Sequence, residues 1–252
     1  MIDFTNKNIL VVGASSGIGE MTAYVLAEQG ANVILVARRE ERLKEVCNNI
    51  KTNKKSYYVG NIADIDSIGA LIKKIVSEQG KLDGLAYVAG ISDGSVPVNI
   101  LTYKRQLNIF QTNYFGFIEC VRQVIKRGNY NVGLRIAAVS SVASLRGEKA
   151  LVAYSASKAA MDSAIRCIAK ELGPKGICIN SVAPSMVNTA MYQGFIEIQG
   201  KKSEANIRAI NRQYLGLAKR TDVANALAFL LSSEARFITG ITLPVDGGFS
   251  TT

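Results

Sequence analysis

A tyrosine and a lysine four residues apart are the first pair in this sequence whose types and spacing could do chemistry. Tyr154 and Lys158 lie in the stretch A-L-V-A-Y-S-A-S-K-A-A, residues 150–160, which contains neither Gly nor Pro. Such a composition favours a helix, in which residues i and i+4 share a face. A neighbouring ammonium group favours the phenolate and predicts a lowered pKa for the phenol. The pair could therefore supply a proton, although the spacing alone is more often that of a solvated helix face.

The amino-acid composition narrows the chemistry that is open to this chain. It contains no His, which excludes Ser-His-Asp and Cys-His triads, so acid–base work must use Tyr, Lys or a carboxylate. The four cysteines, at positions 47, 120, 167 and 178, form no C-x-x-C pair. Neither a disulfide framework nor a metal site is predicted.

The charge and hydropathy of the chain indicate its class of partner. The formal net charge of +10 favours an anionic ligand or partner. The basic residues are spread along the chain without a nucleic-acid-binding motif, so nucleic-acid binding is not expected. No apolar run reaches the roughly 18 residues that span a bilayer, and the N-terminus lacks a signal pattern. We therefore expect a cytoplasmic protein that does not enter a membrane.

A glycine-rich turn stands between two predicted strands near the N-terminus. Residues 7–12 end in the apolar run I-L-V-V, G-A-S-S-G-I-G follows at 13–19, a helical stretch covers about 20–29, and residues 33–36 form a second buried strand. Glycines let backbone N–H groups approach a pyrophosphate, and the helix N-terminus adds favourable partial charge. Ser15 and Ser16 can add hydroxyl donors. This unit predicts a dinucleotide-binding site.

The glycine spacing and the later Y-x-x-x-K together resemble the classical short-chain dehydrogenase/reductase family, and the resemblance covers nearly the whole chain. It implies a nicotinamide-dependent oxidoreductase. Alternating strand and helix patterns predict an α/β fold, a single Rossmann-type doubly wound domain over residues 1–252 with a seven-stranded parallel sheet and helices on both faces. The further strands are expected at 55–59, 82–90 (with its turn), 134–139, 176–182 and 241–245, with helices at 40–50, 64–79, about 107–127, about 150–172 and 221–231.

The resemblance also implies the catalytic residues. The family's serine stands thirteen residues before the tyrosine, which is Ser141, and its active-site asparagine corresponds to Asn113 in Q-T-N-Y-F-G. Ser141 and Tyr154 would hold the substrate oxygen and Tyr154 would transfer the proton. Lys158 would bind the ribose of the nicotinamide and lower the Tyr154 pKa, while Asn113 would anchor a water relay.

The end of the second strand indicates which nicotinamide cofactor is bound. The strand ends V-A-R-R at 36–39, with no acid until Glu40. A carboxylate would repel the 2′-phosphate of NADP, whereas a guanidinium can bind it through two hydrogen bonds. We expect NADP(H), with Arg38 as the first phosphate ligand and Arg39 as a second or stacking contact.

The resemblance assigns a larger set of residues to the cofactor, and four positions depart from the family pattern. Tyr87 and Val88 replace two asparagines of N-N-A-G, Asn61 replaces an aspartate, and Ser185 replaces the glycine of P-G-x-x-x-T. How the turn at Tyr87 is braced is thus left open by the sequence. The implied cofactor-binding residues are Gly13, Ser15, Ser16, Gly17, Ile18, Gly19, Arg38, Arg39, Asn61, Ile62, Ala89, Gly90, Tyr154, Lys158, Pro184, Val187 and Thr189.

The sequence predicts an NADP(H)-dependent oxidoreductase that interconverts a ketone and a secondary alcohol. A segment at about 185–216, with several apolar residues, is expected to form a lid over a partly apolar substrate. A 3-oxoacyl chain on a carrier protein is one alternative substrate, with Arg127 and Lys175 as docking charges, and a free ketone, steroid or sugar-derived ketone is another. A non-catalytic NADP(H)-binding regulator or scaffold is the alternative of a different class. The resemblance implies a homotetramer.

Overall fold

The computed structural model describes residues 2–199, 207 and 210–251, and within them seven strands form one parallel sheet. The strand order is β3-β2-β1-β4-β5-β6-β7, so the chain changes direction across the sheet between β1 and β4. Such a reversal opens a crevice at the carboxyl ends of the strands. The strands are β1 (Asn8–Val12), β2 (Asn32–Ala37), β3 (Lys55–Val59), β4 (Leu82–Tyr87), β5 (Tyr130–Val139), β6 (Cys178–Pro184) and β7 (Thr242–Val245).

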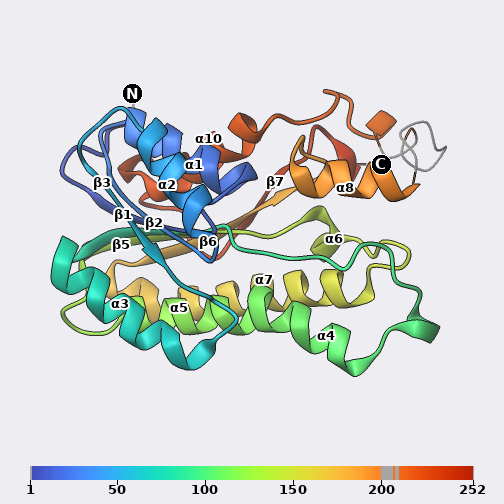
Figure 1. The fold of residues 1–252 in the computed structure, drawn as a ribbon, viewed down its shortest axis with the longest axis horizontal. Helices are drawn as coiled ribbons and strands as arrows, with labels where there is room; N and C mark the ends of the chain where they lie inside the picture. The colour runs from blue at the N-terminus through green and yellow to red at the C-terminus, as the bar shows by residue number, and fades with distance from the viewer. Residues whose placement is uncertain (1, 200–206, 208–209, 252) are drawn as a thin grey trace.

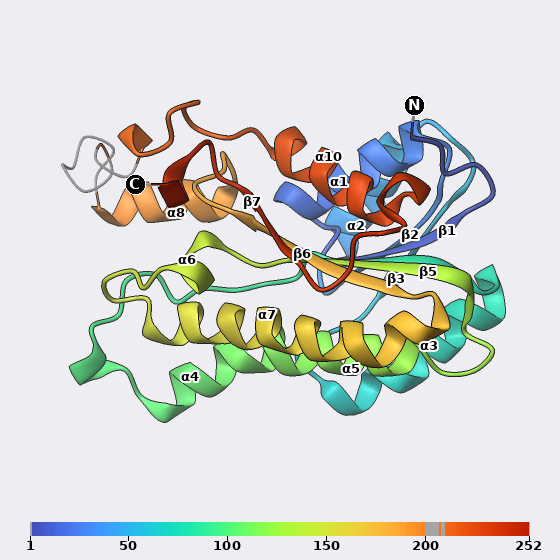
Figure 2. The ribbon, with the colours of Figure 1, turned by 180° about the vertical axis from the view of Figure 1, so that it is seen from behind.

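Helices cover both faces of this sheet, as Figures 1 and 2 show from opposite sides. One layer holds α1 (Gly17–Glu28), α2 (Glu40–Asn49) and α10 (Arg220–Leu231). The other holds α3 (Ile65–Gln79), α4 (Tyr103–Phe110), α5 (Gly116–Val124) and α7 (Val152–Leu172). Two more helices, α6 (Val142–Leu145) and α8 (Ala190–Gln199), lie on opposite sides of one end of the molecule (Figure 1). The doubly wound α/β fold is confirmed.

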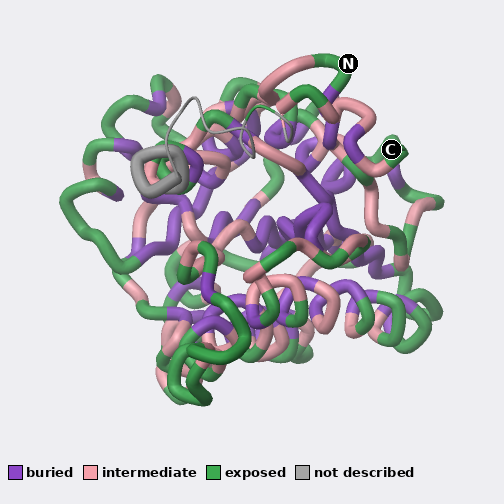
Figure 3. The backbone as a smooth tube through the Cα atoms, turned by 90° about the vertical axis from the view of Figure 1, so that its right-hand side faces the viewer, coloured by how far each residue is buried: buried purple, intermediate pink, exposed green. Residues whose placement is uncertain are grey.

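Two apolar cores hold the layers together, one on each face of the sheet. Alternate residues of β1 point to opposite faces, so Ile9 and Val11 join the core beneath α1 and α10. Leu10 and Val12 join the core beneath α3, α5 and α7. Figure 3 shows the buried strands at the centre, with exposed residues on the helices outside. The near-continuous apolar strands of the sequence are therefore buried on both sides.

Two elements differ from the expectation drawn from the sequence, and a third, the expected lid, is described only in part. Strand β5 begins at Tyr130, four residues before the predicted start. The single long helix expected up to residue 127 is divided, since the π-helical turn η2 (Gln111–Phe115) separates α4 from α5. The expected lid, residues 185–216, contains α8, and its residues 200–206 and 208–209 lie outside the described residues. Among the described helices, we find none whose length and hydropathy would let it cross a bilayer.

Gly19 allows helix α1 to start directly against the glycine-rich turn. A methyl group at this position would overlap the carbonyl oxygen of Gly13. The obstacle is main chain, which cannot rotate away as a side chain can. The first turn of α1 and the end of β1 therefore depend on the absence of a side chain at this position.

We expect Gly19→Ala to destabilise the protein by about 1–3 kcal/mol, because the added methyl group forces the backbone apart. Gly194→Ala is the matched control: Gly194 lies in α8 with no other described atom within 4 Å of an added Cβ. Alanine favours a helix over glycine, so the control should keep or slightly raise the melting temperature. Thermal unfolding followed by circular dichroism measures both, and equal melting temperatures would contradict the packing argument.

Candidate active site

The structure brings Asn113, Ser141, Tyr154 and Lys158 together at the carboxyl ends of β4 and β5. The Ser141 and Tyr154 side chains are hydrogen-bonded to each other. The Lys158 ammonium nitrogen lies 6.0 Å from the centre of the Tyr154 ring. A Cβ built on Gly90 would lie 3.2 Å from that nitrogen and 3.5 Å from Asn113 Oδ1. Four residues from three separate segments of the chain thus surround one small region beside Gly90.

Each of these side chains is held by the element that carries it. Tyr154 and Lys158 lie in the first two turns of α7, as their spacing predicts. Ser141 follows β5 and caps α6, its hydroxyl accepting a hydrogen bond from Ala143 N at 3.2 Å. Asn113 lies in the π-helical turn η2 and is fully buried. The site therefore lies at the carboxyl ends of the strands and is carried by η2 and α7, two helices of the same layer.

Lys158 is the most deeply buried charged group of the site. Its side chain is 2% exposed, and Nζ donates to the carbonyl oxygen of Val139, the last residue of β5, at 2.7 Å. Burial lowers the pKa of Lys158 to about 8, and the carboxylate of Asp162 opposes that change. The ammonium group therefore changes its charge close to neutral pH.

The expectation that Lys158 lowers the pKa of Tyr154 is wrong for the protein by itself. Desolvation of the phenol raises the Tyr154 pKa above its usual value, and the hydrogen bond with Ser141 only partly opposes this. The physical reason is that burial disfavours the phenolate, while the ammonium of Lys158 is directed to the Val139 carbonyl. Tyr154 is accordingly protonated at neutral pH and able to donate.

Asn113 braces the backbone that follows β4. Its Oδ1 accepts from Ile91 N at 2.8 Å, and its Nδ2 donates to Ile91 O at 3.0 Å. The same Nδ2 donates to Ser157 Oγ at 3.0 Å, which joins η2 to α7. Neither Ser157 nor Ile91 carries a signal in the sequence that would mark it as part of the site. The amide therefore fixes the turn containing Gly90 directly beside Lys158.

Tyr87, which replaces an asparagine of the family pattern, supports the π-helical turn that carries Asn113. The N–H of Gly116 bonds to the carbonyl of Gln111, five residues back, instead of to that of Thr112. The hydroxyl of Tyr87 donates to the Thr112 carbonyl at 2.5 Å. Tyr87 is fully buried, and its ring meets that of Phe117 edge-on at 5.3 Å. Tyr87 thus braces η2, and Asn113, carried by η2, braces the turn after β4.

The glycine-rich turn has the shape that a dinucleotide requires. Gly13 has a φ of 92°, and a Cβ there would lie 2.6 Å from Ala89 N, so the ends of β1 and β4 touch through their backbones. Ser16 precedes α1, but its side chain makes no capping hydrogen bond. The first N–H groups of α1 are thus open to an anion. These features fit a pyrophosphate group.

The two arginines after β2 differ in their contacts. Arg39 Nη2 donates to Ser15 Oγ at 3.0 Å and to Ser16 Oγ at 2.7 Å. Arg38 is exposed and makes no hydrogen bond or ion pair with any described residue. Both guanidinium groups follow the strand whose end faces the turn, so positive charge lies beside it.

The remaining residues assigned to the cofactor lie at neighbouring strand ends, though not all make contacts there. Thr189 faces the turn, since a Cβ on Gly17 would lie 3.6 Å from its methyl group. Ile62 is 5% exposed and packs against Gly116, whereas Asn61 accepts a hydrogen bond from Ala63 N at 3.2 Å. The others are Ile18 and Gly19 at the start of α1, Ala89 and Gly90 after β4, Pro184 at the end of β6, and Val187, which is 5% exposed.

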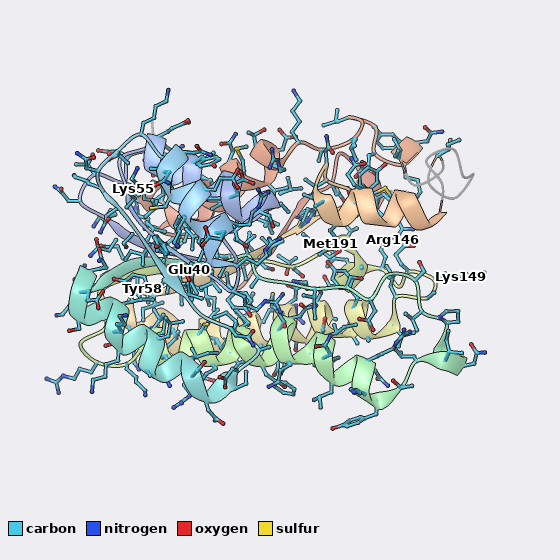
Figure 4. All side chains as sticks on the ribbon, in the orientation of Figure 1. Glu40, Lys55, Tyr58, Arg146, Lys149 and Met191 are labelled. Atoms are coloured by element: carbon cyan, nitrogen blue, oxygen red, sulfur yellow. The ribbon has the colours of Figure 1, made fainter. Side chains whose placement is uncertain are left out.

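The segment expected to form a lid begins with a hydrogen-bonded loop. Ser185, in place of the family's glycine, donates its hydroxyl hydrogen to Gln213 Oε1, which also accepts from Met186 N at 2.9 Å. Figure 4 shows Met191 of α8 and Arg146, just after α6, between these two helices. The side chains of Phe195, Ile196 and Ile198 lie outside the described residues.

Comparison with known proteins is consistent with this geometry. Residues 13–250 match the family model described as Enoyl-(Acyl carrier protein) reductase. The chain is 35% identical over 250 residues to an L-xylulose reductase of Caenorhabditis elegans, covering 98% of this chain and 97% of that protein. It is 33% identical over 247 residues to the 3-oxoacyl-[acyl-carrier-protein] reductase FabG of Staphylococcus aureus, covering 96% and 97%.

Solved structures with the same fold include two instructive neighbours. A short-chain type dehydrogenase/reductase from Mycobacterium ulcerans matches with a TM-score of 0.90 at 26% identity, over 99% of this chain and 92% of that one. ElxO with NADP bound matches with a TM-score of 0.88 at 29% identity, over 98% and 99%. Both alignments extend over nearly the whole chain.

We expect Tyr87→Phe to lower the free energy of unfolding by about 1–3 kcal/mol, because the buried Thr112 carbonyl loses its hydroxyl donor. Tyr58→Phe is the matched control, since it removes a hydroxyl that bonds to Glu78 at 2.8 Å near the edge of the sheet. Urea denaturation compares the two variants with the parent. A Tyr87→Phe protein no less stable than Tyr58→Phe would refute the bracing role.

Proposed function

The chain belongs to the short-chain dehydrogenase/reductase family, whose members are nicotinamide-dependent oxidoreductases, and from this membership we propose an NADP(H)-dependent enzyme that interconverts a ketone and a secondary alcohol. Oxidoreductase chemistry at a CH–OH group is common to the family. The observation that carries the proposal is the meeting of Ser141, Tyr154, Lys158 and Asn113 beside Gly90. A regulator without turnover would have no need of this arrangement.

The chemistry that the nicotinamide supplies when bound is hydride transfer at the substrate carbon. The turn at Gly13, the open N-terminus of α1 and the residues at the ends of β4 and β6 would hold the dinucleotide. The backbone contact between Gly13 and Ala89 supports this assignment, because a side chain at Gly13 would clash with the Ala89 main chain and push the two strand ends of the crevice apart.

The protein's own residues would handle the substrate oxygen and its proton. Ser141 and Tyr154 share a hydrogen bond, so a carbonyl oxygen can take its place between the two hydroxyls. Tyr154, protonated at neutral pH, donates its hydrogen to this oxygen as negative charge develops there. Lys158 supplies a positive charge 6.0 Å from the ring and favours the phenolate that remains. Asn113 keeps Gly90 and Ile91 in place beside them.

NADP(H) is the proposed form of the cofactor, with Arg38 as the ligand of the 2′-phosphate. Arg39 is engaged by the hydroxyls of Ser15 and Ser16 and so fixes the glycine-rich turn. Arg38 has no such partner among the described residues, and its exposed guanidinium can take a phosphate. The NADP bound to ElxO, a protein with the same fold, supports this choice.

A small carbonyl compound or the matching alcohol is the proposed substrate, under a lid formed by residues of about 185–216. L-xylulose reductase among the relatives supports a polar, sugar-derived ketone. The FabG relatives support a 3-oxoacyl chain on a carrier as the second candidate. Arg127 and Lys175 precede β5 and β6, so within one chain they lie at the opposite edge of the sheet from Ser141. They are therefore not suited to dock a carrier at this site of the same chain.

The oligomeric state and the cellular location are also part of this proposal. A homotetramer is expected from the family resemblance and a cytoplasmic location from the sequence, and we retain both as proposals. Size-exclusion chromatography with light scattering tests the oligomeric state directly.

We expect Tyr154→Phe to lower kcat by about 10²–10⁴-fold, because the proton donor is lost. NADPH binding, measured by fluorescence titration, should stay within about threefold of the parent. Turnover is followed as NADPH oxidation with acetoacetyl thioester and L-xylulose as first substrates. Parental turnover in this variant would end the proposed mechanism.

We expect Arg38→Asp to reverse the cofactor preference, because a carboxylate repels the 2′-phosphate and accepts hydrogen bonds from the ribose hydroxyls of NADH. The ratio of kcat/KM for NADPH to that for NADH should fall by roughly 100-fold or more, given charge-assisted bonds of about 1.5–3 kcal/mol and the added repulsion. Arg39→Ala is the control and should weaken both cofactors alike, since it loosens the turn. An unchanged ratio in Arg38→Asp would exclude Arg38 as the phosphate ligand.

A further inference from the structure

A buried carboxylate lies one helical turn beyond Lys158. Asp162 is 3% exposed and accepts hydrogen bonds from three serine hydroxyls: Ser140 at 2.7 Å, Ser144 at 2.5 Å and Ser181 at 2.7 Å. It forms no ion pair with any described residue. Carboxylates are seldom fully buried without a paired charge, and their isolated burial is costly. Packing alone therefore does not explain why a carboxylate is buried at this position.

The serine hydroxyls join α7 to the carboxyl ends of the two strands behind the site. Ser140 directly follows β5, and its backbone N–H bonds to Val182 O of β6 at 2.7 Å. Ser181 lies in β6 and also bonds to Thr242 Oγ1 of β7 at 3.0 Å. The network therefore fixes the position of α7 relative to the sheet.

The same network reaches the loop that carries Ser141. The hydroxyl of Ser144 lies 2.7 Å from the carbonyl oxygen of Ser141 and 2.5 Å from Asp162 Oδ2. The hydroxyl donates its single hydrogen to Asp162, and the backbone N–H of Ser144 donates to the Ser141 carbonyl at 2.9 Å. Ser144 thus links the Ser141 main chain to the helix that carries Tyr154. The network therefore aligns the hydroxyls of Ser141 and Tyr154, which must both face the substrate oxygen. Asp162 itself contacts neither hydroxyl.

The negative charge of Asp162 also favours the charged form of Lys158. The two residues are at i and i+4 of α7, which places them on one face of the helix. Among the described residues, the hydrogen-bond partner of the Lys158 ammonium is the neutral Val139 carbonyl, and burial disfavours the charged form of this group. The charge of Asp162 acts in the opposite direction and favours the ammonium.

We propose that Asp162 is a positioning residue of the reaction, a buried counter-charge that keeps Lys158 protonated and aligns Ser141 with Tyr154. The inference rests on the proposed function, because Lys158 matters only if Tyr154 transfers a proton. The titratable groups that face Lys158 are Tyr154 and Asp162, both from α7. Its neighbours from the other elements, Gly90, Asn113 and Val139, do not titrate.

The test is the pH profile of Asp162→Asn. Turnover that needs the Lys158 ammonium falls as the pH rises through the Lys158 pKa, which is about 8 in the protein by itself. Without the carboxylate the ammonium is less favoured, so this fall should begin at a lower pH, by about one unit or more. The measurement is kcat/KM for acetoacetyl thioester, or for L-xylulose if it is the faster substrate, at saturating NADPH between pH 5 and pH 10, as approximate limits.

Ser181→Ala is the matched control, because it removes one hydrogen bond of Asp162 and leaves the charge in place. It should lower the melting temperature while the alkaline fall stays where the parent has it. An alkaline fall at the parental pH in Asp162→Asn overturns the proposal. So does an equal shift in both variants, since that would mark a purely structural effect.

Variants that do not fold, and a parent without the proposed activity, also give a defined result. If Asp162→Asn does not fold, Asp162→Ser, smaller and uncharged, takes its place with the same expected shift. If neither folds while Ser181→Ala does, the carboxylate is structural and the proposal is wrong. The proposed function fails separately, when the parent shows no NADPH oxidation or Tyr154→Phe keeps parental turnover. An active parent with an unshifted Asp162→Asn profile removes only the role of Asp162.

Discussion

The hydrogen bond from the buried Lys158 ammonium to the Val139 carbonyl is the contact on which the rest of the site depends. It fixes α7 to the end of β5, and so determines where Tyr154 stands relative to Ser141. Burying an ammonium group is unfavourable, and one neutral carbonyl offsets only part of the cost. The protein therefore gains a well-positioned cation at the expense of a lowered Lys158 pKa, which leaves the cation sensitive to its surroundings.

Close backbone contacts make room for this arrangement. Gly13 touches Ala89, and Gly90 faces Lys158 and Asn113, so the ends of β1 and β4 meet without side chains between them. This is where the strand order reverses, and the crevice there is open by topology. Asn113 then closes one side by holding both backbone groups of Ile91. The glycines leave the crevice accessible, and the Asn113 amide holds the backbone after β4 rigid.

The sequence predicts the sheet well because its signals are local and physical. Apolar runs such as residues 33–36, bounded by glycines and charged residues, mark strands buried on both faces, and the Tyr154–Lys158 spacing marks a helix face. The π-helical turn at Gln111–Phe115 has no such signal, since it depends on the Tyr87 hydroxyl from a distant strand. The direction of the Tyr154 pKa was missed for a similar reason: desolvation is set by packing, whereas the neighbouring charge is visible in the sequence. Asp162 could have been found, since an acid four residues after a buried lysine is an i, i+4 pair.

Desolvation acts on both titratable groups of the pair, and this explains why the site needs more than Tyr154 and Lys158. Burial raises the pKa of the phenol and lowers that of the ammonium, so by itself it moves both groups toward their neutral forms. A neutral tyrosine is a usable donor, but a neutral lysine cannot stabilise the phenolate that the donor becomes. A negative charge beyond Lys158 restores the ammonium while lying one turn further along the helix from the phenol. The carboxylate of Asp162 occupies that position, and its three serine partners hold it there without adding a competing cation.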